Sequence, residues 1–378
     1  MVKIRKKLLD LSSIGIADII GSGISALFWF YVASTMGPEG YGQITYFLSI
    51  ALLASGISLL GAAPTIMVYT AKNVKIQPAL YVMTLAASSI ASIIVFFIFF
   101  NVGISSLILG YVIFSLISSE LLGRKLYRKY SKFVLTQKGL MVGFALGFYY
   151  LLGDEGILIG IALSFSPYIY GIVSGFRKAK VDFSLVRERI EFVRNSFFHT
   201  LTGTLSESLD KLLIAPLLGF VILGNYSLSL QFLGLLMIIP TVVSKYLIPE
   251  ISAGIENKKL KKIIILFSIG VAILGFTVGP TLLSIVFPKF PEAAEVIQII
   301  SWAAIPNTVT IVYYSKFWAT EKNRKVLFGS IINIITLIIG IIILGSLYNV
   351  NGVAVALVLA SGASAIYAAI SDNLEKWR

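Results

Sequence analysis

The sequence predicts an all-α, polytopic membrane protein with about twelve transmembrane helices in two pseudo-symmetric six-helix lobes. Its composition is the first reason, because 57% of the 378 residues are hydrophobic and 13% are charged, whereas an average soluble domain is about 25% charged. Apolar runs are the second reason. They recur along the whole chain at about 20 residues each, which is enough for a helix to cross ~30 Å of hydrocarbon.

The apolar runs follow one another with short connections. The basic N-terminus resembles the start of a signal peptide, but the apolar region that follows exceeds the usual ~7–15 residues and has no A-x-A cleavage pattern, so we expect a retained first span. In chain order, the expected spans are 8–34, 41–70, 79–100, 102–121, 133–152, 156–176, 195–219, 225–252, 263–287, 293–319, 326–347 and 350–371.

The distribution of positive charge is the third reason. The two termini and every second connection lie on the same side of the membrane in this span order, and together they hold 27 of the 31 lysines and arginines. This count assigns Lys138 to the loop before the fifth span. Lys289 is the one on the opposite side, and Lys211, Lys245 and Lys316 fall within spans. Because cytoplasmic loops retain positive charge, we expect both termini in the cytoplasm. A miscounted span would spoil this alternation, so the bias also supports the span count.

The longest charged segment, 177–194, separates two sets of six spans. We expect an N-terminal lobe over 1–176, an amphipathic linker along the cytoplasmic interface, and a C-terminal lobe over 195–378. Six spans per lobe give both lobes the same orientation, related by an axis along the membrane normal. A short internal repeat supports a duplication of the six-span lobe. The glycines Gly37 and Gly42 recur as Gly219 and Gly224, at an offset of 182, and a residue with an amide side chain follows each pair.

Several classes of function are disfavoured by what the sequence lacks. It contains no cysteine and one histidine, which excludes thiolate sites and a histidine-rich metal site, so we expect no metal and no cofactor. No connection exceeds roughly 20 residues and no GxxxxGK[ST] motif occurs, which argues against an ATP-driven pump. The net charge of +13 suits membrane orientation and anionic lipid rather than nucleic acid. A membrane-embedded enzyme using Glu207 and Asp210 remains an alternative.

The seventh span concentrates charge on one face. At ~100° per residue, His199, Glu207, Asp210 and Lys211 share one arc, opposite a leucine face. Charges within a membrane are costly and mark the path of a substrate or ion. Alternatively, Glu207 and Lys211, four residues apart, form an internal ion pair. We therefore expect either a cavity-lining site or a self-neutralising pair.

The first span carries a second polar stripe. Asp18, Ser22 and Ser25 follow helical spacing, and Asp18 either titrates, pairs with a base or forms a packing hydrogen bond. Lys245 either lines the pathway or extends to the headgroups, and Lys316 is expected to extend to the headgroups. Glu120 and Arg124 are expected to form a surface pair.

Three stretches resemble a known family: Thr35–Gly42 (TMGPEGYG, similar to its LGPEEYG), Ser206–Gly219, and the segment from Asn225. They resemble the polysaccharide-transport family of O-antigen-type flippases, within the multidrug/oligosaccharidyl-lipid/polysaccharide exporter superfamily. The resemblance implies two six-helix lobes that alternate between inward-open and outward-open forms, with Asp210 and Lys211 lining the cavity. Family members often carry an arginine one turn before this aspartate, whereas this chain has Glu207 there and lacks a thirteenth or fourteenth span.

The expected function is therefore a flippase that moves a polyprenyl-(pyro)phosphate-linked oligosaccharide from the cytoplasmic to the outer leaflet of the cell membrane. The expected partners are that lipid, membrane lipid, a coupling proton or sodium ion, and polysaccharide-assembly proteins. Two alternatives stay open. A multidrug or cation antiporter would use the acidic residues, which outnumber Lys211, and a non-transporting assembly partner would need no pathway.

Overall fold

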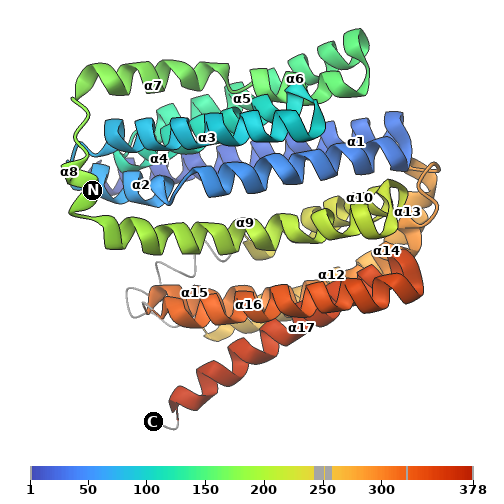
Figure 1. Cartoon of the computed structure of the whole chain (residues 1–378). Helices are drawn as coiled ribbons and strands as arrows, with labels where there is room; N and C mark the ends of the chain where they lie inside the picture. The colour runs from blue at the N-terminus through green and yellow to red at the C-terminus, as the bar shows by residue number, and fades with distance from the viewer. Residues whose placement is uncertain (1, 242–250, 252–257, 321, 377–378) are drawn as a thin grey trace. The chain divides into compact units, whose positions relative to one another are not determined.

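The computed structural model describes residues 2–241, 251, 258–320 and 322–376, and within them every regular element is a helix (Figure 1). The predicted fold class, an all-α polytopic membrane protein, is confirmed. Large apolar side chains are exposed along several helices, for example Ile90 and Phe97, both more than half exposed. Such surface is costly in water and suits lipid.

Two of the apolar helices are far longer than a membrane is thick. By length and hydropathy, six helices of the described residues could each cross a membrane, or seven if the α12–α13 pair, bent by 46°, counts as one. Helix α1 (Val2–Ser58) has 57 residues and breaks at Gly37, where φ is 76° and Pro38 follows. Helix α17 (Ser346–Lys376) breaks at Tyr348 and Asn349. At ~1.5 Å per residue an unbroken α1 would be ~85 Å long, so its break separates the first two predicted spans.

The chain divides into two compact units, and the first contains residues 1–29 and 47–204. Besides its parts of α1 and α9, it contains α2 (Ala62–Ala71), α3 (Gln77–Phe99), α4 (Val102–Gly123), α5 (Tyr127–Leu152), α6 (Asp154–Leu163), α7 (Ser166–Lys178) and α8 (Ser184–Arg187). Helix α4 packs against α2, α3, α6 and α7. The Asn101 side chain caps its start by accepting a hydrogen bond from the Ile104 amide at 3.0 Å, as an N-cap asparagine does.

The charged segment 177–194 packs onto this first unit. Val186 and Val193 are 4% and 5% exposed and join its apolar core. The guanidinium of Arg189 lies 5.1 Å from the centre of the Tyr69 ring and donates to the Leu185 carbonyl at 2.9 Å. Two of its apolar residues are thus buried in protein, whereas Val181, Phe183 and Ile190 are exposed. That the segment lies along the cytoplasmic interface stays a prediction.

The second unit contains residues 30–46 and 205–378. Besides its part of α9 (Ile190–Leu218), it contains α10 (Phe220–Leu236), α12 (Lys258–Thr277), α13 (Gly279–Val286), α14 (Ala293–Ile300), the 3₁₀ turn η1 (Ser301–Ala303), α15 (Ala304–Ala319), α16 (Asn323–Gly340), the π-helical turn η2 (Ile341–Gly345) and α17. The fully buried Asn225 joins α10 to the start of α14, because its side chain accepts from the Ala293 amide at 3.1 Å and donates to Glu292 at 3.3 Å.

The two repeated glycine pairs, Gly37 with Gly42 and Gly219 with Gly224, lie at one contact inside this second unit. Gly37 and Gly219 both have positive φ, 76° and 94°, just before a helical segment. A Cβ on Gly42 would lie 2.0 Å from the Phe220 carbonyl oxygen, and one on Gly224 would lie 1.9 Å from the Pro38 carbonyl oxygen. The equivalent segments therefore pack against each other, backbone to backbone, in a way that only glycine permits.

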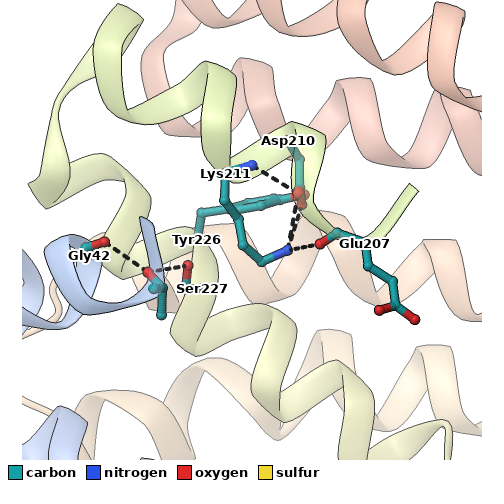
Figure 2. Close-up of polar contacts among 7 residues, drawn as sticks. Gly42, Glu207, Asp210, Lys211, Tyr226 and Ser227 are labelled. Carbon is teal, nitrogen blue, oxygen red and sulfur yellow. Dashed lines mark hydrogen bonds and ion pairs between the residues drawn. The ribbon is translucent and has the colours of Figure 1, made fainter. Parts of the chain in front are cut away.

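A side-chain contact follows the same offset. The Ser227 hydroxyl donates to Thr45 Oγ1 at 3.3 Å across 182 residues, and Thr45 Oγ1 donates to the Gly42 carbonyl at 2.9 Å (Figure 2). Because equivalent positions touch each other, a local two-fold axis passes near this contact.

Candidate functional site

An ion pair between a buried aspartate and a partly buried lysine lies at the centre of the charged stretch on α9. Lys211 Nζ contacts Asp210 Oδ1 at 3.0 Å and Oδ2 at 3.3 Å. The hydroxyl of Tyr226, on α10, donates to Asp210 Oδ2 at 3.1 Å (Figure 2). Asp210 is 5% exposed and Tyr226 is fully buried. Neighbouring residues on a helix do not normally face each other, but here the long lysine side chain folds back onto the carboxylate that Tyr226 holds in place.

Glu207 contributes its backbone rather than its carboxylate to this cluster. Its carbonyl oxygen accepts from Lys211 Nζ at 2.7 Å, while its carboxylate is directed away from that ammonium in Figure 2 and its residue is exposed. The expected Glu207–Lys211 ion pair is therefore not the one observed. The physical reason is that Asp210 is more buried and already oriented, so it is the better partner for a cation in a low dielectric.

The charge of this cluster limits what it can bind. Two carboxylates, on Glu207 and Asp210, accompany one ammonium, on Lys211, whose side chain is 22% exposed. An anion would have to compete with Asp210 for the lysine, whereas a cation could approach the exposed Glu207 directly. The cluster thus offers two chemistries, anion binding by exchange and cation binding at Glu207.

The first unit brings together a second polar group. Asp18 is half-buried and interacts with the hydroxyl of Tyr130. One turn along α1, Gly21 lies against Lys138, since a Cβ there would be 3.5 Å from Lys138 Cγ. Ser22 is exposed. The Ser25 hydroxyl oxygen is buried without a hydrogen-bond partner in the described part of the chain.

Lys138 corrects the charge count made from the sequence. That count places it in the loop before the fifth span, although the predicted span 133–152 already contains it, and α5 (Tyr127–Leu152) places it near the middle of the helix. Helix α5 starts six residues before the predicted span because Tyr130 and Phe133 are packed against an apolar core although basic residues surround them.

The remaining expected site residues are spread over the chain. His199 is exposed on the part of α9 that belongs to the first unit. Lys245 lies outside the described residues. Asp18, Ser22, Ser25 and His199 therefore share one unit, and Glu207, Asp210 and Lys211 share the other, so the pathway through them stays a prediction.

The structure also bears on the expectations for Lys316 and for the Glu120–Arg124 pair. The ammonium of Lys316 pairs with Asp372, which is 4% exposed, and links α15 to α17. That Lys316 extends to the headgroups stays a prediction. The Glu120–Arg124 pair is confirmed at 2.7 Å. It is more than a surface pair, because Glu120 is 7% exposed and also accepts from the Tyr81 hydroxyl.

Sequence reasoning missed Tyr226, Lys138 and Asp372. A usable signal existed for Tyr226, because Asn225, Ser227 and Ser229 surround it with polar side chains in an otherwise apolar segment. All four are buried. No group of histidine, aspartate and glutamate side chains among the described residues is arranged to hold a metal ion.

Comparisons with known proteins define the class of fold. A multidrug-resistance transporter of the MATE family, from the MOP superfamily and in an inward-facing conformation, matches with a TM-score of 0.71, 13% identity, and coverage of 97% of this chain and 98% of that one. The lipid II flippase MurJ, in an inward closed conformation, matches with a TM-score of 0.72, 15% identity, and coverage of 95% and 87%. A MATE protein in a bent conformation matches with a TM-score of 0.64, 15% identity, and coverage of 97% and 95%. The chain is thus a multi-pass membrane protein with the transporter and flippase fold of this superfamily.

A match to a family model narrows the class of protein within this fold. A family model described as "Polysaccharide biosynthesis protein" matches residues 156–286, which include the whole of α9 and α10. No curated protein matched the sequence. The resemblance to a polysaccharide-transport family within the superfamily is confirmed by this match together with the shared fold.

Proposed function

We propose that the protein moves a polyprenyl-phosphate- or pyrophosphate-linked oligosaccharide from the cytoplasmic to the outer leaflet of the cell membrane, for cell-surface polysaccharide assembly. The observation that carries the proposal is that the polysaccharide-biosynthesis match, residues 156–286, contains the buried Asp210–Lys211–Tyr226 cluster. A polar, anionic headgroup cannot cross hydrocarbon uncompensated. A partly buried ammonium that can exchange partners would lower that barrier while the lipid tail remains in the bilayer.

The mechanism we propose is alternating access with exchange of the partner of Lys211. At rest its ammonium is held by Asp210, and a cargo phosphate would take over that contact when the headgroup enters. Protonation of Glu207 or Asp18, or binding of sodium, would couple the cycle to an ion gradient, because the membrane potential contributes ~2.3 kcal/mol per charge per 100 mV. The fold of transporters and flippases supports transport rather than catalysis as the activity.

Reconstitution tests this proposal directly. The purified protein is placed in liposomes that contain a fluorescent polyprenyl-pyrophosphate oligosaccharide, and transfer between leaflets is followed by the accessibility of the label to a membrane-impermeant quencher. Lys211→Gln is compared with Lys211→Arg, and Lys132→Gln on the exposed surface of α5 serves as the matched loss of charge. We expect transfer by the parent protein, the arginine variant and the Lys132 control, and at least a tenfold loss in the glutamine variant.

Two results would overturn parts of the proposal. Full-rate transfer by Lys211→Gln would remove the lysine from the mechanism while leaving the flippase activity. Absence of transfer by the folded parent protein would favour the assembly partner that needs no pathway.

A cation antiporter is the second candidate function. The observation that favours it is the exposed Glu207 carboxylate in a cluster with more acids than bases. The same liposomes, given a fluorescent organic cation and a proton or sodium gradient, would distinguish it. Gradient-driven cation uptake without lipid transfer, abolished by Glu207→Gln, would replace the flippase proposal.

A further inference from the structure

A polar pocket lies in the first unit, and the Glu120–Arg124 pair forms part of its wall. It has a volume of about 630 Å³. The connection between α2 and α3 contributes Asn73 and Lys75 to its wall, and Gln77 follows at the start of α3. Glu120 comes from the last turn of α4, and Arg124 and Lys125 come from the connection between α4 and α5. The end of α7 closes it. These connections are among those that the positive-charge bias assigns to the cytoplasmic side of the membrane.

The pocket is positively charged because Lys75, Arg124 and Lys125 line it together with a single carboxylate, that of Glu120. Glu120 accepts from Arg124 Nε at 2.7 Å and from the Tyr81 hydroxyl. Arg124 uses Nε for this contact, and within the described residues no hydrogen bond of its two terminal amino groups is seen. Lys75 and Lys125 are exposed and add two further cations to the wall.

The framework around these cations is fixed. Gln77, 5% exposed, donates to Thr70 Oγ1 at 2.5 Å. Gly123 sits so close to α2 that a Cβ there would lie 2.6 Å from the Met67 carbonyl oxygen. Lys125 takes a positive φ of 59° where α4 ends, and the turn is closed by hydrogen bonds such as Lys125 N to Leu122 O at 2.9 Å. A pocket whose polar wall is held in place this way loses little entropy when it binds a ligand.

Positive charge continues beyond the pocket. A neighbouring pocket of about 570 Å³ shares Lys75 and adds Arg177 and Lys180. Its carboxylate, Asp182, already accepts hydrogen bonds from the Ser184 amide at 2.9 Å and the Ser184 hydroxyl at 2.6 Å. These hydrogen bonds hold the pKa of Asp182 below its usual value.

We propose that the pocket lined by Lys75, Arg124 and Lys125 binds the phosphate group of an anionic ligand, either a phospholipid headgroup or a soluble phosphate ester. Arginine and lysine together with amide side chains are a typical set of donors for phosphate. The connections that line the pocket are predicted to lie on the cytoplasmic side, next to the cytoplasmic leaflet of the membrane. That leaflet is anionic, and each basic residue near its surface strengthens lipid binding. The site does not depend on the identity of the transported cargo.

Binding to the purified full-length protein in neutral detergent tests the proposal. The probes are dioctanoyl phosphatidylglycerol, dioctanoyl phosphatidylcholine and inorganic phosphate, measured by thermophoresis. We expect saturable binding of phosphatidylglycerol that is about 30-fold weaker in Lys75→Gln/Lys125→Gln, from ~1 kcal/mol per lysine and tenfold per ~1.4 kcal/mol. The control Lys129→Gln/Lys132→Gln removes two exposed lysines outside the pocket and should change affinity less than about threefold.

The source of the phosphate follows from competition. If inorganic phosphate and phosphatidylglycerol bind in the same millimolar range and displace each other, the phosphate group alone is recognised, as a soluble phosphate ester requires. If phosphatidylglycerol binds far more tightly and millimolar phosphate does not displace it, the rest of the lipid contributes and the ligand is a lipid headgroup. Equal losses in the two double variants would show that surface charge alone attracts the lipid and would overturn the proposal. So would a parent protein that binds phosphatidylglycerol no better than phosphatidylcholine and does not bind phosphate. Because both pocket lysines are exposed, the variants are expected to fold, which thermal unfolding checks.

Discussion

Gly224→Ala is expected to force apart the two equivalent segments of the second unit. The added Cβ would lie 1.9 Å from Pro38 O, 2.6 Å from Pro38 C and 2.9 Å from Pro38 Cα. All three atoms belong to the backbone, so no side-chain rotation relieves the overlap. Overpacking of this kind costs ~1–3 kcal/mol and occasionally more, against a gain of ~1 kcal/mol for replacing glycine by alanine in a helix. We expect a net loss of up to about 2 kcal/mol.

The assay is thermal unfolding in detergent, followed by the fluorescence of the four tryptophans, because the chain has no cysteine to report with a thiol dye. Gly143→Ala on α5 is the matched control, since a Cβ there meets nothing within 4 Å. It should be neutral or stabilising by up to ~1 kcal/mol. Gly42→Ala should destabilise like Gly224→Ala, because its Cβ would lie 2.0 Å from Phe220 O.

The double variant tests the shared contact itself. Once one alanine has moved the two segments apart, the second meets less resistance, so Gly42→Ala/Gly224→Ala should cost less than the sum of the single variants. Strict additivity, or a Gly224→Ala protein as stable as Gly143→Ala, would refute the close approach of the two segments.

Two further predictions concern buried charges. Tyr226→Phe removes the hydroxyl that donates to the buried Asp210 and should lower the free energy of unfolding by ~1.5–3 kcal/mol, measured by the same thermal assay. Lys316→Met leaves Asp372 buried without its cation and should cost on the order of 3 kcal/mol. Lys316→Met/Asp372→Asn should recover most of that loss, and a double variant as unstable as the single one would contradict the ion pair.

The fold class can be predicted because it depends on averages over the whole chain. Composition, run length and charge bias survive errors at individual residues, and the break of α1 at Gly37 is readable because glycine and proline follow each other there. Even so, the predicted fifth span begins six residues after the start of α5. A helix boundary depends on tertiary packing, here of Tyr130 and Phe133 onto an apolar core, and packing is not local information.

The candidate site can be predicted only in part, for a geometric reason. Helical spacing places Glu207, Asp210 and Lys211 on one face, but it cannot choose between two acids for one lysine. The choice is made by Tyr226, which lies 16 residues further along the chain on another helix. Which hydroxyl meets which carboxylate depends on the rotation of α10 against α9, and no spacing rule within one helix specifies it.

Asp210→Asn follows from the exchange that the proposed function requires. At rest Asp210 competes with any incoming anion for Lys211 Nζ, which it contacts at 3.0 Å. Asparagine keeps the size and can still accept from Tyr226, but it replaces a hydrogen bond between charged groups by a weaker one, a difference of about 1 kcal/mol. The variant should therefore bind the labelled lipid-linked oligosaccharide about fivefold more tightly, and release should become slower by a similar factor. Binding is measured by fluorescence anisotropy in detergent, with Lys211→Arg as a control that keeps the charge. Unchanged or weaker binding by a folded Asp210→Asn protein would mean that the cargo does not exchange with Asp210 at Lys211.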